Sequence, residues 1–234
     1  MYYGGYYGRF DYIQILLIAI PFLFCLLAQG LVKSRYSRFS KIANRRNITG
    51  AQAAFELLRS QGITNVRIEQ IAGNLTDHYD PKANTIRLSE GVYNSTSIAA
   101  VGIACHEAGH ACQYHCNYVP IKIRAFVIPM ANIGSSIGLP LCIIGIIFTS
   151  FSFLFYVGII LYSAVFIFQL ATLPVEFNAS SRALKSIKQI GLLGEDEYGG
   201  AKKVLSAAAL TYVASMSSSL LTLIRLLLIG GRKK

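Results

Sequence analysis

Two long apolar runs follow each other without a polar linker: 126-FVIPMANIGSSIGLPLCIIGIIFTS-150 and 151-FSFLFYVGIILYSAVFIFQLATL-173. Neither contains a formal charge, and each is long enough to cross about 30 Å of hydrocarbon as an α-helix. They therefore predict a tight transmembrane hairpin, in which neighbouring helices tolerate kinks at Pro129 and Pro140. This hairpin decides the fold, because it returns the chain to the side of the membrane from which it came.

Two further apolar segments flank this hairpin, 12-YIQILLIAIPFLFCLLAQGLV-32 and 204-VLSAAALTYVASMSSSLLTLIRLLLI-229. The first is uncharged and has no small-residue cleavage site after it, which favours an uncleaved anchor over a signal peptide. The second is less apolar, and its small residues suit either close helix packing or a place in the interface. With 53% hydrophobic residues among 234, the sequence predicts a mainly α membrane protein with three to four transmembrane helices.

The distribution of basic residues predicts the orientation of the chain in the membrane. Twelve Lys and Arg lie in 33–125 and five lie in 176–203, so the positive-inside rule places both regions in the cytoplasm, in a cell membrane that the chain crosses several times. A fourth full crossing would leave the basic tail 231–234 outside, against the rule. The net charge of +11 suits attraction to anionic lipid headgroups, and no nucleic-acid-binding module is recognisable.

These features divide the chain into five predicted parts. They are an N-terminal segment with the first transmembrane helix (1–32), a catalytic region (33–125), the transmembrane hairpin (126–174), a further helix (175–203), and a C-terminal hydrophobic helix with a basic tail (204–234).

The hydrophilic region predicts a small α+β element. Thr49 is a suitable N-cap for a helix over 50–62. Short β-type alternation follows in 65–73 and 84–90, with a turn-rich segment between them, and predicts a hairpin of two strands. One of the Ser and Thr residues at 95–97 then caps a helix over 98–115. Small zinc peptidases use this order, with an exposed strand edge beside the metal helix.

The predicted helix 98–115 contains 105-CHEAGH-110. His106 and His110 lie one helical turn apart on one face, with Glu107 beside them, which is the HExxH arrangement. In that arrangement the two histidines bind Zn²⁺, and the glutamate is the general base for a water that the zinc activates. A catalytic zinc needs a third protein ligand and one open position.

Four residues are candidates for the third ligand. The longer signature HExxHxxGxxH fails at its last two positions, which leaves His115 and Cys116 as weaker local candidates. His78, in a predicted turn, could instead hydrogen-bond a substrate or transition-state oxygen, or be an ordinary surface histidine. Glu176 lies 66 residues after the second motif histidine, directly after the hairpin, at the start of a helix that Pro174 is expected to open. Because the hairpin returns the chain to its starting side, Glu176 is the preferred ligand.

Five stretches, in this order and spacing, carry a resemblance over essentially the whole chain: GRFDY, LTDHYDP, IRLSE, HEAGHA and LPVEFNASSRAL. They resemble the YugP-like family of neutral zinc metallopeptidases of bacterial membranes. In the wider group of membrane gluzincins, a helix after HExxH supplies the third ligand in a Glu-x-x-x-Asp pattern. Here the pattern runs from Glu176 to Ser180, so Ser180 or Asn178 would replace the acidic partner of a zinc histidine.

The resulting prediction is a membrane-embedded zinc metallopeptidase, an endopeptidase with Zn²⁺ as cofactor, a polypeptide as substrate and the lipid bilayer as surroundings. Its oligomeric state is left open. The alternative is a non-catalytic zinc-binding scaffold or sensor, in which Cys112 or Cys116 would close the ligand shell.

Overall fold

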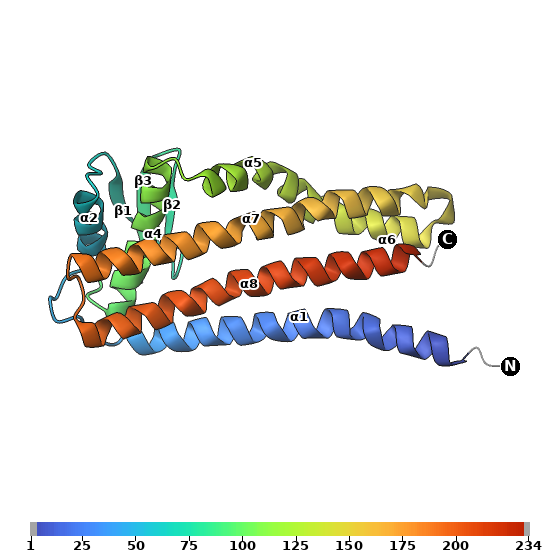
Figure 1. Ribbon diagram of the computed structural model, residues 1–234, viewed down its shortest axis with the longest axis horizontal. Helices are drawn as coiled ribbons and strands as arrows, with labels where there is room; N and C mark the ends of the chain where they lie inside the picture. Colours follow the sequence, from blue (N-terminus) through green and yellow to red (C-terminus); the bar gives the residue numbers. More distant parts are fainter. Residues whose placement is uncertain (1–3, 232–234) are drawn as a thin grey trace. The chain divides into compact units, whose positions relative to one another are not determined.

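The computed structural model describes the backbone of residues 4–231 and the side chains of residues 12–231 (Figure 1). Helices dominate it, with one small sheet. The elements are α1 (Gly4–Phe39), α2 (Gly50–Ser60), β1 (Arg67–Ile71), β2 (His78–Asp80), β3 (Thr85–Ser89), α3 (Glu90–Tyr93), α4 (Ile98–His115), α5 (Val119–Ile133), the π-helix η1 (Gly134–Gly138), α6 (Leu139–Ile147), the 3₁₀-helix η2 (Thr149–Phe151), α7 (Phe153–Gln189) and α8 (Glu195–Gly231).

The described chain contains four helical segments that are long and apolar enough to cross a membrane: Tyr12–Phe39, Val119–Ile147, Phe153–Gln189 and Glu195–Gly231. The prediction of a mainly α membrane protein with a small α+β element is therefore confirmed. The second segment begins at Val119 rather than at 126, because Pro120 suits the first turn of a helix and no helix breaker follows before the apolar run. Residues 232–234 of the basic tail lie outside the described residues.

The chain divides into two compact units. We call the described parts of 1–28, 122–173 and 211–234 the membrane unit, and 29–121 with 174–210 the site unit.

The membrane unit contains the predicted helical hairpin. Helices α5 and α6 form one arm and the first part of α7 forms the other, joined by a turn at 148–152 (yellow in Figure 1). The arms approach closely at Gly158, where a Cβ atom would lie 2.5 Å from the carbonyl oxygen of Gly138. Close contact through small residues is how helices associate without a hydrophobic driving force between them.

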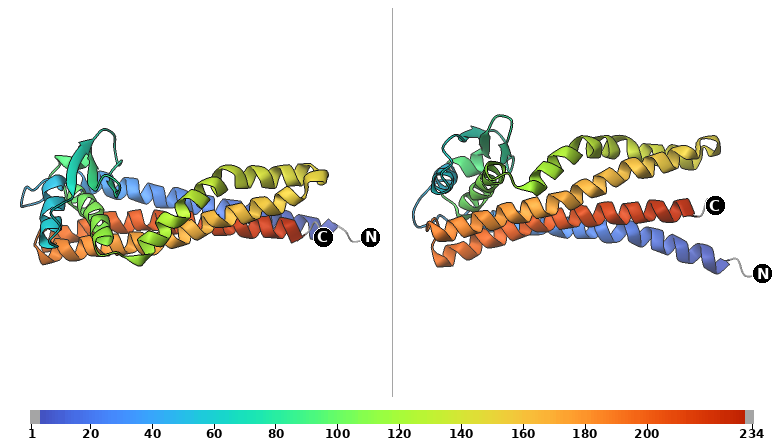
Figure 2. Two further views of the ribbon diagram at one scale, coloured as in Figure 1. Left: turned by 90° about the horizontal axis from the view of Figure 1, so that it is seen from above. Right: turned by 45° about the horizontal axis from the view of Figure 1, so that its top comes forward.

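The site unit has a core between α4 and its neighbours. Thr49 forms a capping box with Gln52 at the start of α2, and Ser97 caps α4, as their sequence predicts. Figures 1 and 2 show α2 and the sheet gathered beside α4. Leu57 of α2, Ile86 of β3 and Val101 of α4 are fully buried in this core, which fixes the orientation of α4.

The sheet differs from the predicted two-stranded hairpin. Its strand order is β1-β3-β2, with β1 and β3 parallel and β2 antiparallel to β3. The predicted pairing of 65–73 with 84–90 as a hairpin was wrong, because the connection between them is long enough to cross over and itself contains β2. The actual hairpin joins β2 to β3, and Asp80 accepts hydrogen bonds from the backbone N–H groups of Lys82 and Ala83 in its turn.

Pro174 does not open a helix, which was also predicted wrongly. It lies inside α7, which runs without a break from Phe153 to Gln189. A proline inside a helix removes one backbone hydrogen bond, a loss that surrounding groups can offset in transmembrane helices.

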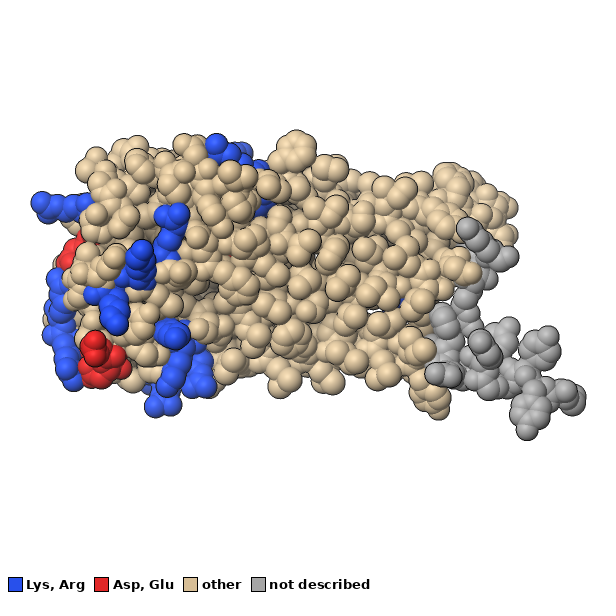
Figure 3. Space-filling view, viewed as in Figure 1, with Lys and Arg blue, Asp and Glu red and all other residues tan. Residues whose placement is uncertain are grey.

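Charged side chains gather on the site unit. Figure 3 shows Lys and Arg over the elements of this unit, whereas the visible face of the membrane unit is almost entirely without charge. This separation follows the sequence, because the two basic regions 33–125 and 176–203 contribute most of the site unit.

Candidate metal centre

Helix α4 positions the residues of the HExxH motif. The imidazole rings of His106 and His110 lie on one face with centroids 4.7 Å apart, as expected for side chains four residues apart on a helix. Glu107 is buried, with 8% of its surface exposed, whereas the two histidines are partly buried. The helix thus presents two partly buried imidazoles and one buried carboxylate.

Helix α7 brings Glu176 to the histidine pair. Its Oε2 atom lies 3.3 Å from Nε2 of His106 and 3.5 Å from Nε2 of His110. Only 2% of Glu176 is exposed. Ligand atoms of all three side chains lie within 4.8 Å of one another, and in the described part of the chain this is the cluster that could hold a metal ion.

Small residues allow α7 to come this close to α4. A Cβ atom at Gly109 would lie 2.6 Å from the carbonyl oxygen of Ala179, far inside van der Waals contact. Ala108 and Ala179 are themselves fully buried. The glycine inside HExxH therefore lets the backbone of α7 lie against the motif.

The outer nitrogen of each histidine has its own partner. Nδ1 of His106 lies 3.1 Å from Oγ of Ser180, and Nδ1 of His110 lies 3.0 Å from Oε1 of Gln113. With Nδ1 engaged in this way, Nε2 of each ring is directed at Glu176. Two imidazole nitrogens and one carboxylate oxygen are a donor set that suits Zn²⁺, so these residues fit the ion.

The electrostatics of the cluster favour a cation. Burial disfavours the protonated form of His110, but its hydrogen bond with Glu176 and the negative charges of Glu107 and Glu176 outweigh burial and raise its pKa above 6.5. A field that stabilises an imidazolium also stabilises a divalent ion in the same place.

The other candidate ligands are not members of this cluster. Cys112 is buried, and burial raises the pKa of its thiol to about 11. Cys116 is exposed, and its sulfur accepts a hydrogen bond from Arg182 at 3.4 Å. His115 is exposed at the end of α4. His78 is exposed on β2, with Nδ1 2.8 Å from the carbonyl oxygen of Thr76. Among the residues that the structure describes, the cluster comprises His106, His110 and Glu176.

Gln113 is a site residue that the sequence analysis missed. It is fully buried and lies three residues after His110 on the same helix. Its amide nitrogen donates to Oδ1 of Asn178 at 3.0 Å. The only signal in the sequence was the spacing of a polar residue on the histidine face of the helix, which is common in helices without a metal.

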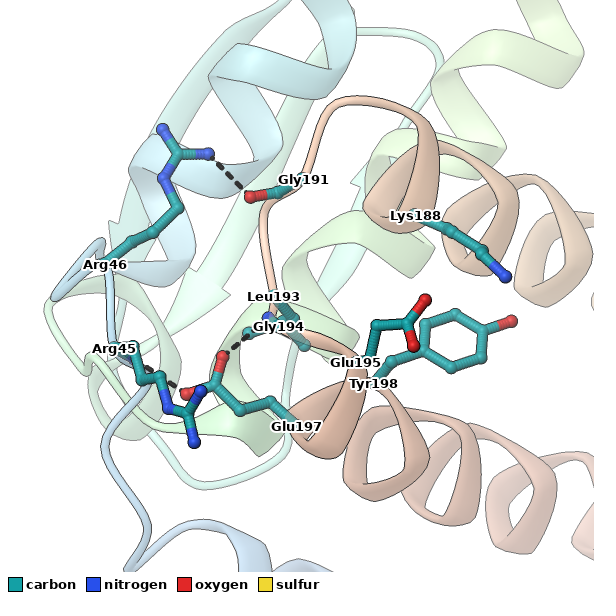
Figure 4. Close-up of a pocket in the computed structure, with 9 residues that line it drawn as sticks. All are labelled: Arg45, Arg46, Lys188, Gly191, Leu193, Gly194, Glu195, Glu197 and Tyr198. Atoms are coloured by element: carbon teal, nitrogen blue, oxygen red, sulfur yellow. Dashed lines mark hydrogen bonds between the residues drawn. The ribbon is translucent and has the colours of Figure 1, made fainter.

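The site unit also contains a cavity of about 590 Å³ at the start of α8 (Figure 4). Three of its charged side chains, those of Arg45, Arg46 and Glu197, form hydrogen bonds with their neighbours. Glu197 accepts hydrogen bonds from the backbone N–H groups of Gly194, at 2.8 Å, and Arg45, at 2.7 Å. The metal ligands are not part of its lining, which is Arg45, Arg46, Lys188, Gly191, Leu193, Gly194, Glu195, Glu197 and Tyr198.

Together, four potential membrane-spanning helices and a cluster of two histidines and one glutamate define a membrane protein with a candidate zinc site. A family described as "putative neutral zinc metallopeptidase" matches residues 14–231, and the chain belongs to this family. It is also 45% identical over 202 residues to the protein named "Putative membrane protease YugP" of Bacillus subtilis (strain 168), which covers 86% of this chain and 89% of that relative. No solved structure matches the chain.

Proposed function

We propose that this chain is a membrane-embedded zinc metallopeptidase that hydrolyses peptide bonds. The observation that supports it most directly is the cluster of His106, His110 and Glu176, with Glu107 on the helical turn between the two histidines. The family to which the chain belongs supports the same activity.

In this proposal each residue has one role. His106, His110 and Glu176 bind the metal as a gluzincin-type ligand set. Zinc held there would act as a Lewis acid and lower the pKa of a bound water to about 7. Glu107 takes the proton of the attacking water as general base and then delivers it to the nitrogen of the leaving amine.

The proposed substrate is an extended polypeptide that binds along β2. This strand is at an edge of the sheet, and the ring of Tyr79 on β2 lies 5.5 Å from the ring of Tyr114 on α4. An exposed edge can bind a peptide by backbone hydrogen bonds, which suits cleavage within a chain. His78, on the same strand, is the candidate donor to the transition-state oxygen.

We further propose that the chain crosses a cell membrane and that the site lies on the cytoplasmic side. The basic residues of 33–125 and 176–203 support this orientation through the positive-inside rule.

Zinc content and peptide hydrolysis of the detergent-purified chain test the proposal. We expect one zinc per chain in the wild type and loss of both zinc and activity in Glu176→Ala, because two histidines alone leave the ion with too few protein ligands. Glu107→Gln should keep its zinc and lose hydrolysis by roughly 10² to 10⁴-fold, the usual effect of a positioned acid or base.

Cysteine variants separate the enzyme from a scaffold in the same two assays. A zinc-binding chain without hydrolysis, whose zinc is lost in Cys112→Ala or Cys116→Ala, would be the non-catalytic alternative. A metal-free wild type would exclude both functions.

A further inference from the structure

Three side chains form a chain of hydrogen bonds from α7 to the metal centre. In this chain, each residue determines which atom of its neighbour donates and which accepts. They are Arg182, Asn178 and Gln113, and all lie in the site unit. The order in which they donate and accept is set from Arg182 inward.

A guanidinium group has donors only. Nε of Arg182 donates to the side chain of Asn178 at 2.7 Å, so the atom that Asn178 presents must be its carbonyl oxygen, Oδ1. Arg182 thereby decides which way round the amide of Asn178 lies. Both residues also line a polar cavity of about 340 Å³.

The oxygen of Asn178 in turn orients Gln113. Oδ1 can only accept, and it lies 3.0 Å from the amide nitrogen Nε2 of Gln113. The same nitrogen lies 2.7 Å from the backbone carbonyl oxygen of Val175. Two acceptors therefore face Gln113 on one side, which requires its NH₂ group there and its oxygen on the other.

That oxygen faces Nδ1 of His110 at 3.0 Å. Because Oε1 can only accept, Nδ1 must carry the proton, and the lone pair of the neutral ring is then on Nε2. Nε2 is the atom directed at Glu176. The donor–acceptor order thus ends in the one tautomer of His110 that can bind a metal at this position.

From this order we infer that Arg182, Asn178 and Gln113 are positioning residues, which hold His110 in its metal-binding tautomer and fasten α7 to α4 beside the third ligand. The second effect follows because the carbonyl that Gln113 binds belongs to Val175, the residue before Glu176. The inference rests on the proposed metal centre, and it adds residues that do not touch the metal.

Zinc affinity of the full-length chain, measured by competition with a chelator, tests the role of Gln113. Gln113→Met keeps the length of the side chain but removes donor and acceptor. We expect it to bind zinc about 10 to 100-fold more weakly, the usual effect of losing a partner of a metal ligand.

The matched control is Asn44→Leu. Asn44 is also a buried amide of the site unit, with 3% exposed, and its nitrogen donates to the backbone carbonyls of Ile48 and Thr96. Its loss should lower the unfolding temperature but leave the zinc affinity of the folded protein unchanged.

The order of donors and acceptors is tested at Asn178. Asn178→Asp still accepts from Arg182 and Gln113, and should keep zinc affinity within about threefold, whereas Asn178→Leu should lose it as Gln113→Met does. This pair decides the matter if Gln113→Met does not fold, because Asp and Leu are both close to Asn in size and only Asp keeps the acceptor that orients Gln113.

Wild-type zinc affinity in Gln113→Met would overturn the inference, and so would an equal loss in Asn178→Asp and Asn178→Leu. A wild-type chain that binds no zinc would overturn the metal centre itself, and this inference with it.

Discussion

At the scale of single residues, the two histidines differ in how they are supported. His110 has a buried amide as its partner, whereas His106 has the hydroxyl of Ser180 at 3.1 Å. A hydroxyl can either accept or donate, so it does not fix which ring nitrogen of His106 carries the proton. A carboxylate at this position would only accept, and would hold the imidazole more firmly.

Substitutions at Ser180 test this difference. Ser180→Ala should weaken zinc binding by about tenfold, and Ser180→Asp should keep or strengthen it, because a carboxylate accepts from Nδ1 of His106. Chelator competition measures both, with Ser181→Ala on the exposed neighbouring position as control. Equal affinity of Ser180→Ala and the wild type would show that His106 needs no partner there.

At the scale of elements, the site depends on the contact between α4 and α7. Gly109→Ala would place a methyl group 2.6 Å from the carbonyl oxygen of Ala179. We expect the helices to separate, with a loss of about 1 to 3 kcal/mol in the free energy of unfolding and weaker zinc binding.

Denaturant unfolding and zinc titration of Gly109→Ala measure these effects. Gly102→Ala is the control, because its methyl group would meet the Cβ atom of Ala201 on α8 at 3.4 Å, close to ordinary contact. If the two variants behaved alike, close approach at Gly109 would have no special role.

The elements that the sequence predicted well are those with local causes. Thr49 and Ser97 cap their helices with their own side chains, and the apolar runs need only length to be recognised. The parallel pairing of β1 with β3 depends on a crossover through β2, a strand of three residues that is too short to show alternation. Pro174 misled the prediction because a local rule favours proline in the first turn of a helix, whereas here it lies inside α7, which began at Phe153.

The same contrast holds within the site. The motif gives His106, Glu107 and His110 directly, and the hairpin argument led to Glu176, which the structure brings to the histidines. Gln113 could not be found in this way. Its partner Val175 is 62 residues further along the chain, and a glutamine one turn after a histidine is common in helices.

At the scale of the whole molecule, the hairpin and the basic residues make a prediction about topology. In a chain whose five native cysteines are replaced, reporter cysteines at Lys82 and Gln189 should resist a membrane-impermeant reagent applied to intact cells. A reporter at Ser150, in the turn between α6 and α7, should react. Labelling at only one of Lys82 and Gln189 would contradict a shared cytoplasmic side.

The division of the ligands between two segments also has a consequence for biosynthesis. The histidines lie before the membrane hairpin and Glu176 lies after it, so the ribosome makes both membrane-crossing arms before it makes the third ligand. A nascent or truncated chain that ends before Glu176 carries only the histidine pair, which is too few protein ligands for a catalytic zinc. The proposed protease would therefore stay inactive until its hairpin has been synthesised, and an unfinished copy could not cleave its neighbours.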